Sequence, residues 1–322
     1  NLFKLQFHEP LEEKQLFKKI KKIGLIKNQV SKKVKSQYED NPYPRWKDCN
    51  ALIGFKSSPT EIINSEIRPN RISTNIDTND LQVLIAGCGT GKQILYAQRY
   101  NNAEVTAIDL SSSSLSYSQR KINELNIRNV ELIQMDILEV SLLKKKFDII
   151  ECCGVLHHMS DPDKGLKSLL SVLSNNGFMK LSLYNKLARE NIIEARKIIR
   201  EINLRPSVEN IRQFRSDVFS GKFPKLHSLC NSGSDFYTTS ECRDLCFHSQ
   251  EHQFSISEIE QIIKSNNLRF YGFSLDIAFK SLYDNKYKDD KTQTNFKYLK
   301  EFEKNYPQAF SNTPPFWISN MK

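Results

Sequence analysis

Three glycines alternate with other residues directly after an apolar run. The run, residues 81–86, has the composition of a buried strand, and residues 91–100 predict a helix. Glycines between a buried strand and a helix allow a tight turn and let a ligand come close to the backbone. We therefore predict a ligand-binding glycine loop that consists of Gly87, Cys88, Gly89, Thr90 and Gly91.

Two carboxylates follow at the ends of the next two predicted strands. Asp109 is placed to accept both hydrogen bonds of a ribose diol. Asp136 is placed to accept from the amine of an adenine, while Met135 and Ile137 pack on the ring. Ligands of open α/β sheets bind at the carboxyl ends of the strands, so the loop and both carboxylates predict one nucleoside site.

The elements that must position these residues alternate between strands and helices. This alternation predicts a parallel sheet that is covered on both faces. We expect an α/β fold with a Rossmann-like, doubly wound sheet of seven strands, mostly parallel with the last strand antiparallel. The predicted strands are residues 81–86, 104–110, 130–137, 147–153, 177–184, 268–275 and 315–321. The predicted helices of the core are residues 91–100, 112–126, 161–175 and 257–266.

The flanking segments are predicted to be mainly helical. Residues 1–36 predict one helix, residues 47–80 a polar connector, and residues 216–234 a polar stretch within an insertion after the fifth strand. We divide the chain into a helical N-terminal arm with a proline-rich flap, a ligand-binding core, an insertion that forms a substrate lid, and a C-terminal completion of the sheet. These are residues 1–77, 78–185, 186–254 and 255–322.

Residues 81–185 resemble a class I S-adenosylmethionine-dependent methyltransferase. The glycine loop and Asp109 are similar to the family's motifs, and so is FDIIECCGVLHHMSDP at residues 147–162. The G-x-G-x-G spacing is that of this family, whereas NAD enzymes typically have G-x-G-x-x-G. The resemblance implies that S-adenosyl-L-methionine is the cofactor, bound by Gly87, Cys88, Gly89, Thr90, Gly91, Asp109, Leu110, Met135, Asp136 and Ile137.

One position departs from the family pattern. The family usually has an acidic residue two positions before the first glycine, where this chain has Ile85. That acidic residue helps to hold the amino-acid end of the cofactor. Tyr38, Tyr43 or Arg45 could take its place, from a segment in which two prolines hold the backbone extended as a flap over the cofactor.

The resemblance extends to a bacterial subgroup in which the methyltransferase often follows tetratricopeptide repeats. Residues 37–46 and 235–254 are similar to that subgroup. The resemblance implies upstream tetratricopeptide repeats. Because such repeats bind peptides, it narrowly favours a protein side chain over a small molecule as the methyl acceptor, by analogy. A nucleic-acid acceptor is disfavoured.

Catalytic residues are sought at the carboxyl edge of the sheet and in the insertion. Methyl transfer from a sulfonium is an in-line displacement, and a general base is needed only if the acceptor atom starts protonated. The candidates are Tyr184 and His157 near the ends of the fifth and fourth strands, and His248, Glu251 and His252 in the insertion. Glu251 is the first candidate for a base or an amine-binding carboxylate.

The sequence His248-x-x-Glu251-His252 also has the form of an inverted zincin motif. On a helix the two histidines would share a face, with Cys242 and Cys246 preceding at similar spacing. No glutamate ligand of a metallopeptidase follows, so we predict no metal site. Polar structural residues and a substrate site in the insertion are the two favoured interpretations of this motif.

Composition and charge bound the remaining functions. The net charge of +10 is concentrated at the start of the chain, where residues 1–47 hold 12 basic and 5 acidic side chains. Such a segment could meet an anionic partner, but a solvated helix explains it as well. Seven cysteines are too few for a disulfide scaffold, and no apolar run is long enough to span a membrane, so we expect a cytoplasmic enzyme.

Three other functions stay open on the sequence alone. A cofactor-binding module without catalysis would keep the nucleoside site and lack transfer. An NAD-type oxidoreductase would use a related sheet, although the glycine spacing disfavours it. A metallohydrolase would use His248, Glu251 and His252.

Overall fold

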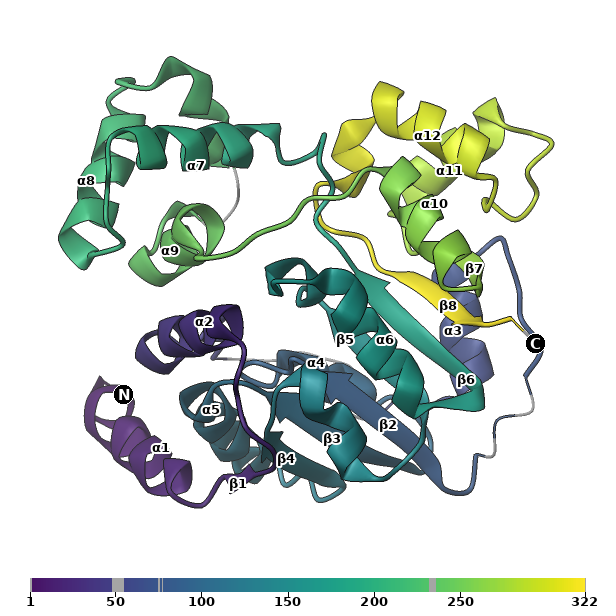
Figure 1. Ribbon diagram of the computed structural model, residues 1–322, viewed down its shortest axis with the longest axis horizontal. Helices are drawn as coiled ribbons and strands as arrows, with labels where there is room; N and C mark the ends of the chain where they lie inside the picture. Colours follow the sequence, from purple (N-terminus) through teal and green to yellow (C-terminus); the bar gives the residue numbers. More distant parts are fainter. Residues whose placement is uncertain (1, 48–54, 75, 77, 232–235, 322) are drawn as a thin grey trace.

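The computed structural model of the chain describes residues 2–47, 55–74, 76, 78–231 and 236–321. Within them, eight strands form one sheet in the order β1-β4-β3-β2-β5-β6-β8-β7 (Figure 1). Neighbouring strands from β1 to β6 are parallel, and β8 is antiparallel to β6 and β7. The Rossmann-like fold is thus confirmed, with one strand more than predicted. The strands are β1 (Lys21–Lys22), β2 (Leu81–Ala86), β3 (Ala103–Asp109), β4 (Val130–Gln134), β5 (Phe147–Cys153), β6 (Leu173–Ser182), β7 (Leu268–Phe273) and β8 (Phe316–Asn320).

Helices cover both faces of the sheet because the central strands are apolar on both sides. One hydrophobic cluster joins one face of the sheet to α3 (Pro59–Ile67), α4 (Lys92–Ala97) and α5 (Ser112–Glu124). A second cluster joins the other face to α6 (Pro162–Val172), α10 (Ile256–Ser265), α11 (Ile277–Lys286) and α12 (Phe296–Asn305). Short helical turns complete these layers: η2 (Ile137–Leu143), η3 (Leu156–His158) and η6 (Pro307–Phe310). In the described part of the chain, no helix combines the length and apolarity needed to cross a bilayer.

The prediction of one helix over residues 1–36 is wrong. The segment contains η1 (Lys4–His8), α1 (Glu9–Phe17), the short strand β1 and α2 (Gln29–Asp40). Strand β1 pairs in parallel with β4, and the Ile23 amide continues the pairing to the Gln134 carbonyl at 3.1 Å. Gly24 follows at φ 74°, which a helix does not accommodate. This pairing supplies the eighth strand of the sheet.

The predicted polar connector at residues 47–80 contains a helix that the prediction missed. Ser58 and Glu61 form a capping box at the start of α3, and Pro59 occupies its first turn. Ile63 and Ile67 of this helix are buried against the sheet. The cap signal was therefore present in the sequence. Residues 48–54 of the predicted connector lie outside the described residues.

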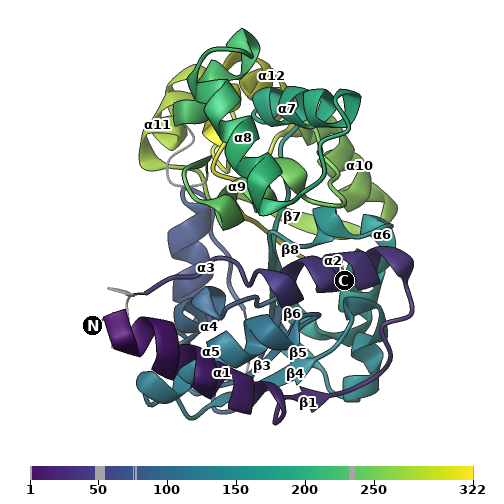
Figure 2. The same ribbon diagram turned by 90° about the vertical axis from the view of Figure 1, so that its left-hand side faces the viewer.

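The insertion after β6 is a small helical unit with its own apolar cluster. The predicted polar stretch at 216–234 is mostly helical, because it holds the end of α8 and all of η4, while residues 232–235 lie outside the described residues. Figures 1 and 2 show α9 facing α2 above the carboxyl edge of the sheet. The helices of the insertion are α7 (Glu190–Glu201), α8 (Val208–Phe219), η4 (Pro224–Asn231) and α9 (Thr239–Phe247).

Candidate cofactor and acceptor site

A cavity of about 440 Å³ lies at the carboxyl ends of the parallel strands. Its walls come from the segments that follow β2, β3, β4, β5 and β6, and α2 and α9 contribute side chains from above. The strand order places the segments after β4 and β3 on one side of the glycine loop and those after β5 and β6 on the other. The cavity therefore has a β4 side and a β6 side. Of the residues predicted from the sequence, it is lined by Tyr38, Tyr43, Gly87, Cys88, Gly89, Thr90, Asp109, Leu110, Met135, Asp136, Ile137 and Tyr184.

The glycine loop joins the end of β2 to the start of α4. Gly87 has φ 78°, and a Cβ there would collide with the side chain of Val155. Gly91 has φ 88° and is the N-cap of α4. A Cβ at Gly91 would collide with Ser118. Both positions thus require glycine, which brings the backbone of the loop to the cavity wall.

Asp109 ends β3 and is held in place by the loop and by its own turn. Its Oδ2 accepts from the Gly89 amide and its Oδ1 from the Ser111 amide, both at 2.8 Å. Burial raises the pKa of Asp109 to about 6, because the desolvation of the carboxylate outweighs these amide hydrogen bonds. The backbone amides thus fix the position of the carboxylate.

Asp136 lies on the β4 side of the cavity. Its Oδ1 accepts from the Leu138 amide at 3.0 Å, and Asp136 is the N-cap of η2. Met135 and Ile137, on either side of it, are buried and line the same cavity. An apolar pair that flanks a carboxylate suits a flat heteroaromatic ring with an amine at its edge.

The Tyr184 ring lies between an imidazole ring and a guanidinium group on the β6 side of the cavity. Its ring stacks on His157 with the centroids 3.6 Å apart, and the Arg189 guanidinium lies 3.6 Å from its centroid. His157 is fully buried, and its Nδ1 accepts from the Tyr184 amide at 3.3 Å. His157 does not line the cavity, whereas the adjacent His158 does. His157 is therefore placed to support Tyr184 from behind.

His158 is the histidine that the cavity exposes to a ligand. Its Nδ1 lies 2.8 Å from the Gln250 carbonyl oxygen, which can only accept, so Nδ1 carries the proton and Nε2 the lone pair. Its ring stacks on His248 with the centroids 3.7 Å apart. Burial lowers the pKa of His158 to about 4, so the imidazole is neutral at physiological pH.

The motif from His248 to His252 is not helical, because α9 ends at Phe247. The Glu251 side chain is completely buried and pairs with Arg189 at 3.1 Å and Arg196 at 3.7 Å. His252 Nε2 lies 3.0 Å from the Met159 carbonyl oxygen. Glu251, His248 and His252 are not among the residues that line the cavity. The shared helical face on which the zinc interpretation depends is absent, and the described residues contain no group of three His, Cys, Asp or Glu side chains that could hold a metal ion.

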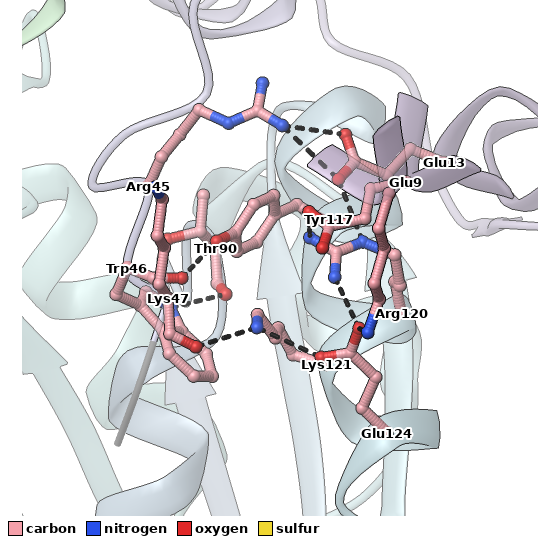
Figure 3. A network of polar contacts seen from close by, with 11 residues as sticks. Glu9, Glu13, Arg45, Trp46, Lys47, Thr90, Tyr117, Arg120, Lys121 and Glu124 are labelled. Atoms are coloured by element: carbon pink, nitrogen blue, oxygen red, sulfur yellow. Dashed lines mark hydrogen bonds and ion pairs between the residues drawn. The ribbon is translucent and has the colours of Figure 1, made fainter. Parts of the chain in front are cut away.

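The flap reaches the glycine loop through its backbone and through Trp46. The Trp46 Nε1 donates to the Thr90 carbonyl at 3.1 Å, and the Thr90 hydroxyl donates to the Pro44 carbonyl. Figure 3 shows that Arg45 points from the flap toward α1, where its Nη2 lies 3.1 Å from Glu13. Arg45 does not line the cavity, whereas Tyr43 does. The flap is thus fastened to the loop, and its arginine is used to hold α1.

Asp244, Lys92 and Gln93 also line the cavity and were not predicted from the sequence, whereas Tyr38 was predicted as one alternative. Tyr38 from α2 and Asp244 from α9 meet over the cavity, where the tyrosine hydroxyl donates to Asp244 Oδ1 at 2.7 Å. Lys92 and Gln93 open α4 directly after the glycine loop and also line the cavity. For Lys92 and Gln93 the signal was their place next to the loop. For Asp244 no local pattern exists, because its contact with Tyr38 joins distant segments of the chain.

Comparison with known proteins agrees with this geometry. Residues 83–177 match the family model described as "Methyltransferase domain". An uncharacterized protein of Synechococcus sp. is 30% identical over 205 residues, which cover 60% of this chain and 48% of that protein. The malonyl-[acyl-carrier protein] O-methyltransferase of Priestia megaterium is 24% identical over 200 residues, which cover 60% of this chain and 63% of that enzyme. The chain thus spans about half the length of the Synechococcus relative.

The fold is shared with a solved structure. PKMT2 from Rickettsia typhi superposes with a TM-score of 0.61 at 18% identity, covering 83% of this chain and 54% of that one. The structure of the same protein in complex with AdoHcy gives a TM-score of 0.60 at 17% identity. At such identities the likeness shows the fold. The match to the family model and the shared Rossmann-like fold thus fall on the same part of the chain, the central strands and the glycine loop.

Proposed function

We propose that the chain is an S-adenosyl-L-methionine-dependent methyltransferase that acts on a protein side chain or a small molecule. The observation that carries the proposal is the single cavity that joins the glycine loop, Asp109 and Asp136 to a second group of polar side chains on the β6 side. The match of residues 83–177 to the methyltransferase family model supports the same conclusion. Upstream tetratricopeptide repeats and a cytoplasmic location stay predictions.

The residues of the β4 side fit the nucleoside part of this cofactor. Asp109 is fixed by two backbone amides and can accept from the ribose hydroxyls. Asp136 can accept from the adenine amine, between the apolar side chains of Met135 and Ile137. The cofactor supplies a methyl group on a sulfonium, which is already activated for in-line displacement. The chain's own task is then to orient the acceptor atom and remove its proton where needed.

The β6 side of the cavity suits an acceptor that carries an amine. The Asp244 carboxylate can stabilise a protonated amine, and the ring of Tyr38 can pack against it. Neutral His158 offers an Nε2 lone pair that can take the proton, since its Nδ1 is engaged by Gln250. Glu251 cannot perform this role in the described arrangement, because two arginines hold it away from the cavity.

The experiment has a binding part and a transfer part. We expect wild-type protein to bind S-adenosylmethionine in the micromolar range by calorimetry. Asp109→Ala should lose this binding, because no other side chain of the turn after β3 replaces the carboxylate. Asp289 is exposed, so Asp289→Ala should bind S-adenosylmethionine as the wild type does. Radiolabelled cofactor is then incubated with a cell extract that is separated into protein, nucleic-acid and small-molecule fractions.

Label in the protein or small-molecule fraction, lost in Asp109→Ala, is the expected outcome. Full cofactor affinity in Asp109→Ala would contradict the assignment of the site. Binding without label in any fraction would instead favour a cofactor-binding module without catalysis.

A further inference from the structure

The end of β2 offers no carboxylate to a ligand in the cavity. Ile85, two residues before the glycine loop, is fully buried. Its register partner on β5 is Glu151, which accepts from the Tyr100 hydroxyl at 2.7 Å and pairs with Arg99 at 3.5 Å. Glu151 is buried and does not line the cavity. A ligand with an amino-acid group must therefore find its partners elsewhere.

Gln93 carries an unsatisfied acceptor beside the glycine loop. Its Nε2 donates to the Cys153 carbonyl at 2.8 Å, and because a carbonyl only accepts, this contact fixes the orientation of the amide. The Gln93 Oε1 is buried and has no hydrogen-bond partner in the described part of the chain. Gln93 and Cys153 both line the cavity. A buried acceptor without a partner is costly, so a donor that binds here gains from satisfying it.

Lys92 supplies a positive charge at the same place. Among the described residues it is the one lysine or arginine that lines the cavity, and no ion pair or hydrogen bond to it is found there. The three acidic residues of the cavity are engaged elsewhere: Asp109 and Asp136 by backbone amides and Asp244 by Tyr38. An anionic group in the cavity is therefore attracted to Lys92.

We propose that Lys92 and Gln93 form the subsite for the amino-acid end of the cofactor. Lys92 binds the α-carboxylate, and the Gln93 Oε1 accepts from the α-ammonium group, in place of a carboxylate at Ile85. This inference rests on the proposed function, because it assigns the part of the cofactor that the nucleoside residues leave uncontacted.

The subsite is tested by calorimetry with three ligands that share the nucleoside. S-adenosylhomocysteine has the whole amino-acid group, its decarboxylated analogue keeps only the amine, and 5′-methylthioadenosine has neither group. Gln93→Leu should weaken S-adenosylhomocysteine about tenfold and leave 5′-methylthioadenosine unchanged. Lys92→Met should weaken S-adenosylhomocysteine by a similar factor and leave both of the other ligands unchanged.

Matched variants separate the subsite from general damage. Gln98→Leu is the control for Gln93→Leu, because Gln98 follows α4 and does not line the cavity. Lys33→Met is the control for Lys92→Met, because Lys33 is exposed on α2 and does not line the cavity. Both should bind all three ligands as the wild type does. Circular dichroism melting of each variant reports whether it is folded.

The possible failures are distinguishable. Equal loss of S-adenosylhomocysteine and 5′-methylthioadenosine in Gln93→Leu would overturn the subsite, and so would unchanged binding of both. If Asp244→Asn shows the selective loss instead, the ammonium group lies at Asp244 and the role of Gln93 is refuted. If the wild type binds 5′-methylthioadenosine as tightly as S-adenosylhomocysteine, the amino-acid group gains nothing from the protein and only the subsite fails. If it binds none of the three ligands, the proposed function itself fails.

Discussion

The Tyr38 hydroxyl donates to Asp244 Oδ1 at 2.7 Å and thereby joins α2 of the N-terminal arm to α9 of the insertion. Burial and the neighbouring carboxylate raise the pKa of Tyr38, so the hydroxyl keeps its proton. The next residue, Glu39, accepts from the amides of Ser112 and Ser113 at the start of α5. Helix α2 thus connects the insertion to the core directly above the cavity. A ligand of this cavity should exchange through movement of α2.

Tyr38→Phe removes this hydrogen bond and keeps the ring. We expect S-adenosylhomocysteine to dissociate several-fold faster, because the lost bond is worth about 1 kcal/mol. Stopped-flow fluorescence of Trp46, which contacts the glycine loop, follows the release. Tyr298→Phe makes the same change away from the cavity and should release the ligand at the wild-type rate. An unchanged rate in Tyr38→Phe would show that α2 does not control exchange.

The core of the fold was predictable because buried parallel strands leave short apolar runs in the sequence. The predicted strand at 147–153 coincides with β5, and that at 104–110 lies within one residue of β3. Strand β1 was not predictable in this way. Its two residues are exposed lysines, so the pairing with β4 depends on backbone hydrogen bonds that leave no apolar pattern.

The residues of the candidate site likewise fall into those that the sequence predicts and those that it does not. The glycine loop and Asp109 were predictable because they lie next to strand ends, where the fold itself sets their place. The environment of Glu251 was not, since its two arginines come from the start and the middle of α7. The sequence also did not show that His158, rather than His157, lines the cavity. The two histidines are adjacent, and the direction of each side chain depends on the turn that carries them.

The binding of S-adenosylhomocysteine should depend on pH through Asp109. Its pKa is raised to about 6, and a protonated carboxyl turns one of its two oxygens into a hydroxyl donor, so it accepts the hydrogen bonds of a ribose diol less well. Affinity should therefore be constant above pH 7 and fall by up to about tenfold per pH unit below pH 6. Calorimetry from pH 5 to 8 measures this.

Asp109→Asn is the matching variant for this dependence. It should bind weakly at every pH and show no fall below pH 6. Exposed Asp289→Asn should keep the wild-type profile. A wild-type profile that is flat down to pH 5 would contradict the role assigned to Asp109.

Arg120 fastens α1 to α5 and should contribute to stability. Its side chain is completely buried and pairs with Glu9 at 3.2 Å, Glu13 at 3.0 Å and Glu124 at 2.8 Å (Figure 3). Arg120→Met leaves these partly buried carboxylates without their cation, which should lower the free energy of unfolding by about 2–3 kcal/mol. Urea denaturation measures the loss, and amide exchange should accelerate in α1.

A surface pair provides the comparison. Lys264 lies 2.7 Å from Glu260, but its side chain is 73% exposed. Lys264→Met should therefore change the free energy of unfolding by less than about 0.5 kcal/mol. Equal effects of Arg120→Met and Lys264→Met would refute the special contribution of the buried arginine.

His158 should make the protein less stable in acid. Burial lowers its pKa to about 4 in the folded chain, below the ordinary value of about 6.5. The unfolded chain therefore binds a proton as the pH falls below about 6.5, whereas the folded chain does not. From pH 7 to pH 5 this difference should lower the free energy of unfolding by about 2 kcal/mol. His158→Gln should lose that part of the pH dependence in urea denaturation at the two pH values. His227 is exposed, so His227→Gln should keep the wild-type pH dependence of the free energy of unfolding. If His158→Gln also keeps it, His158 is not buried as the neutral imidazole.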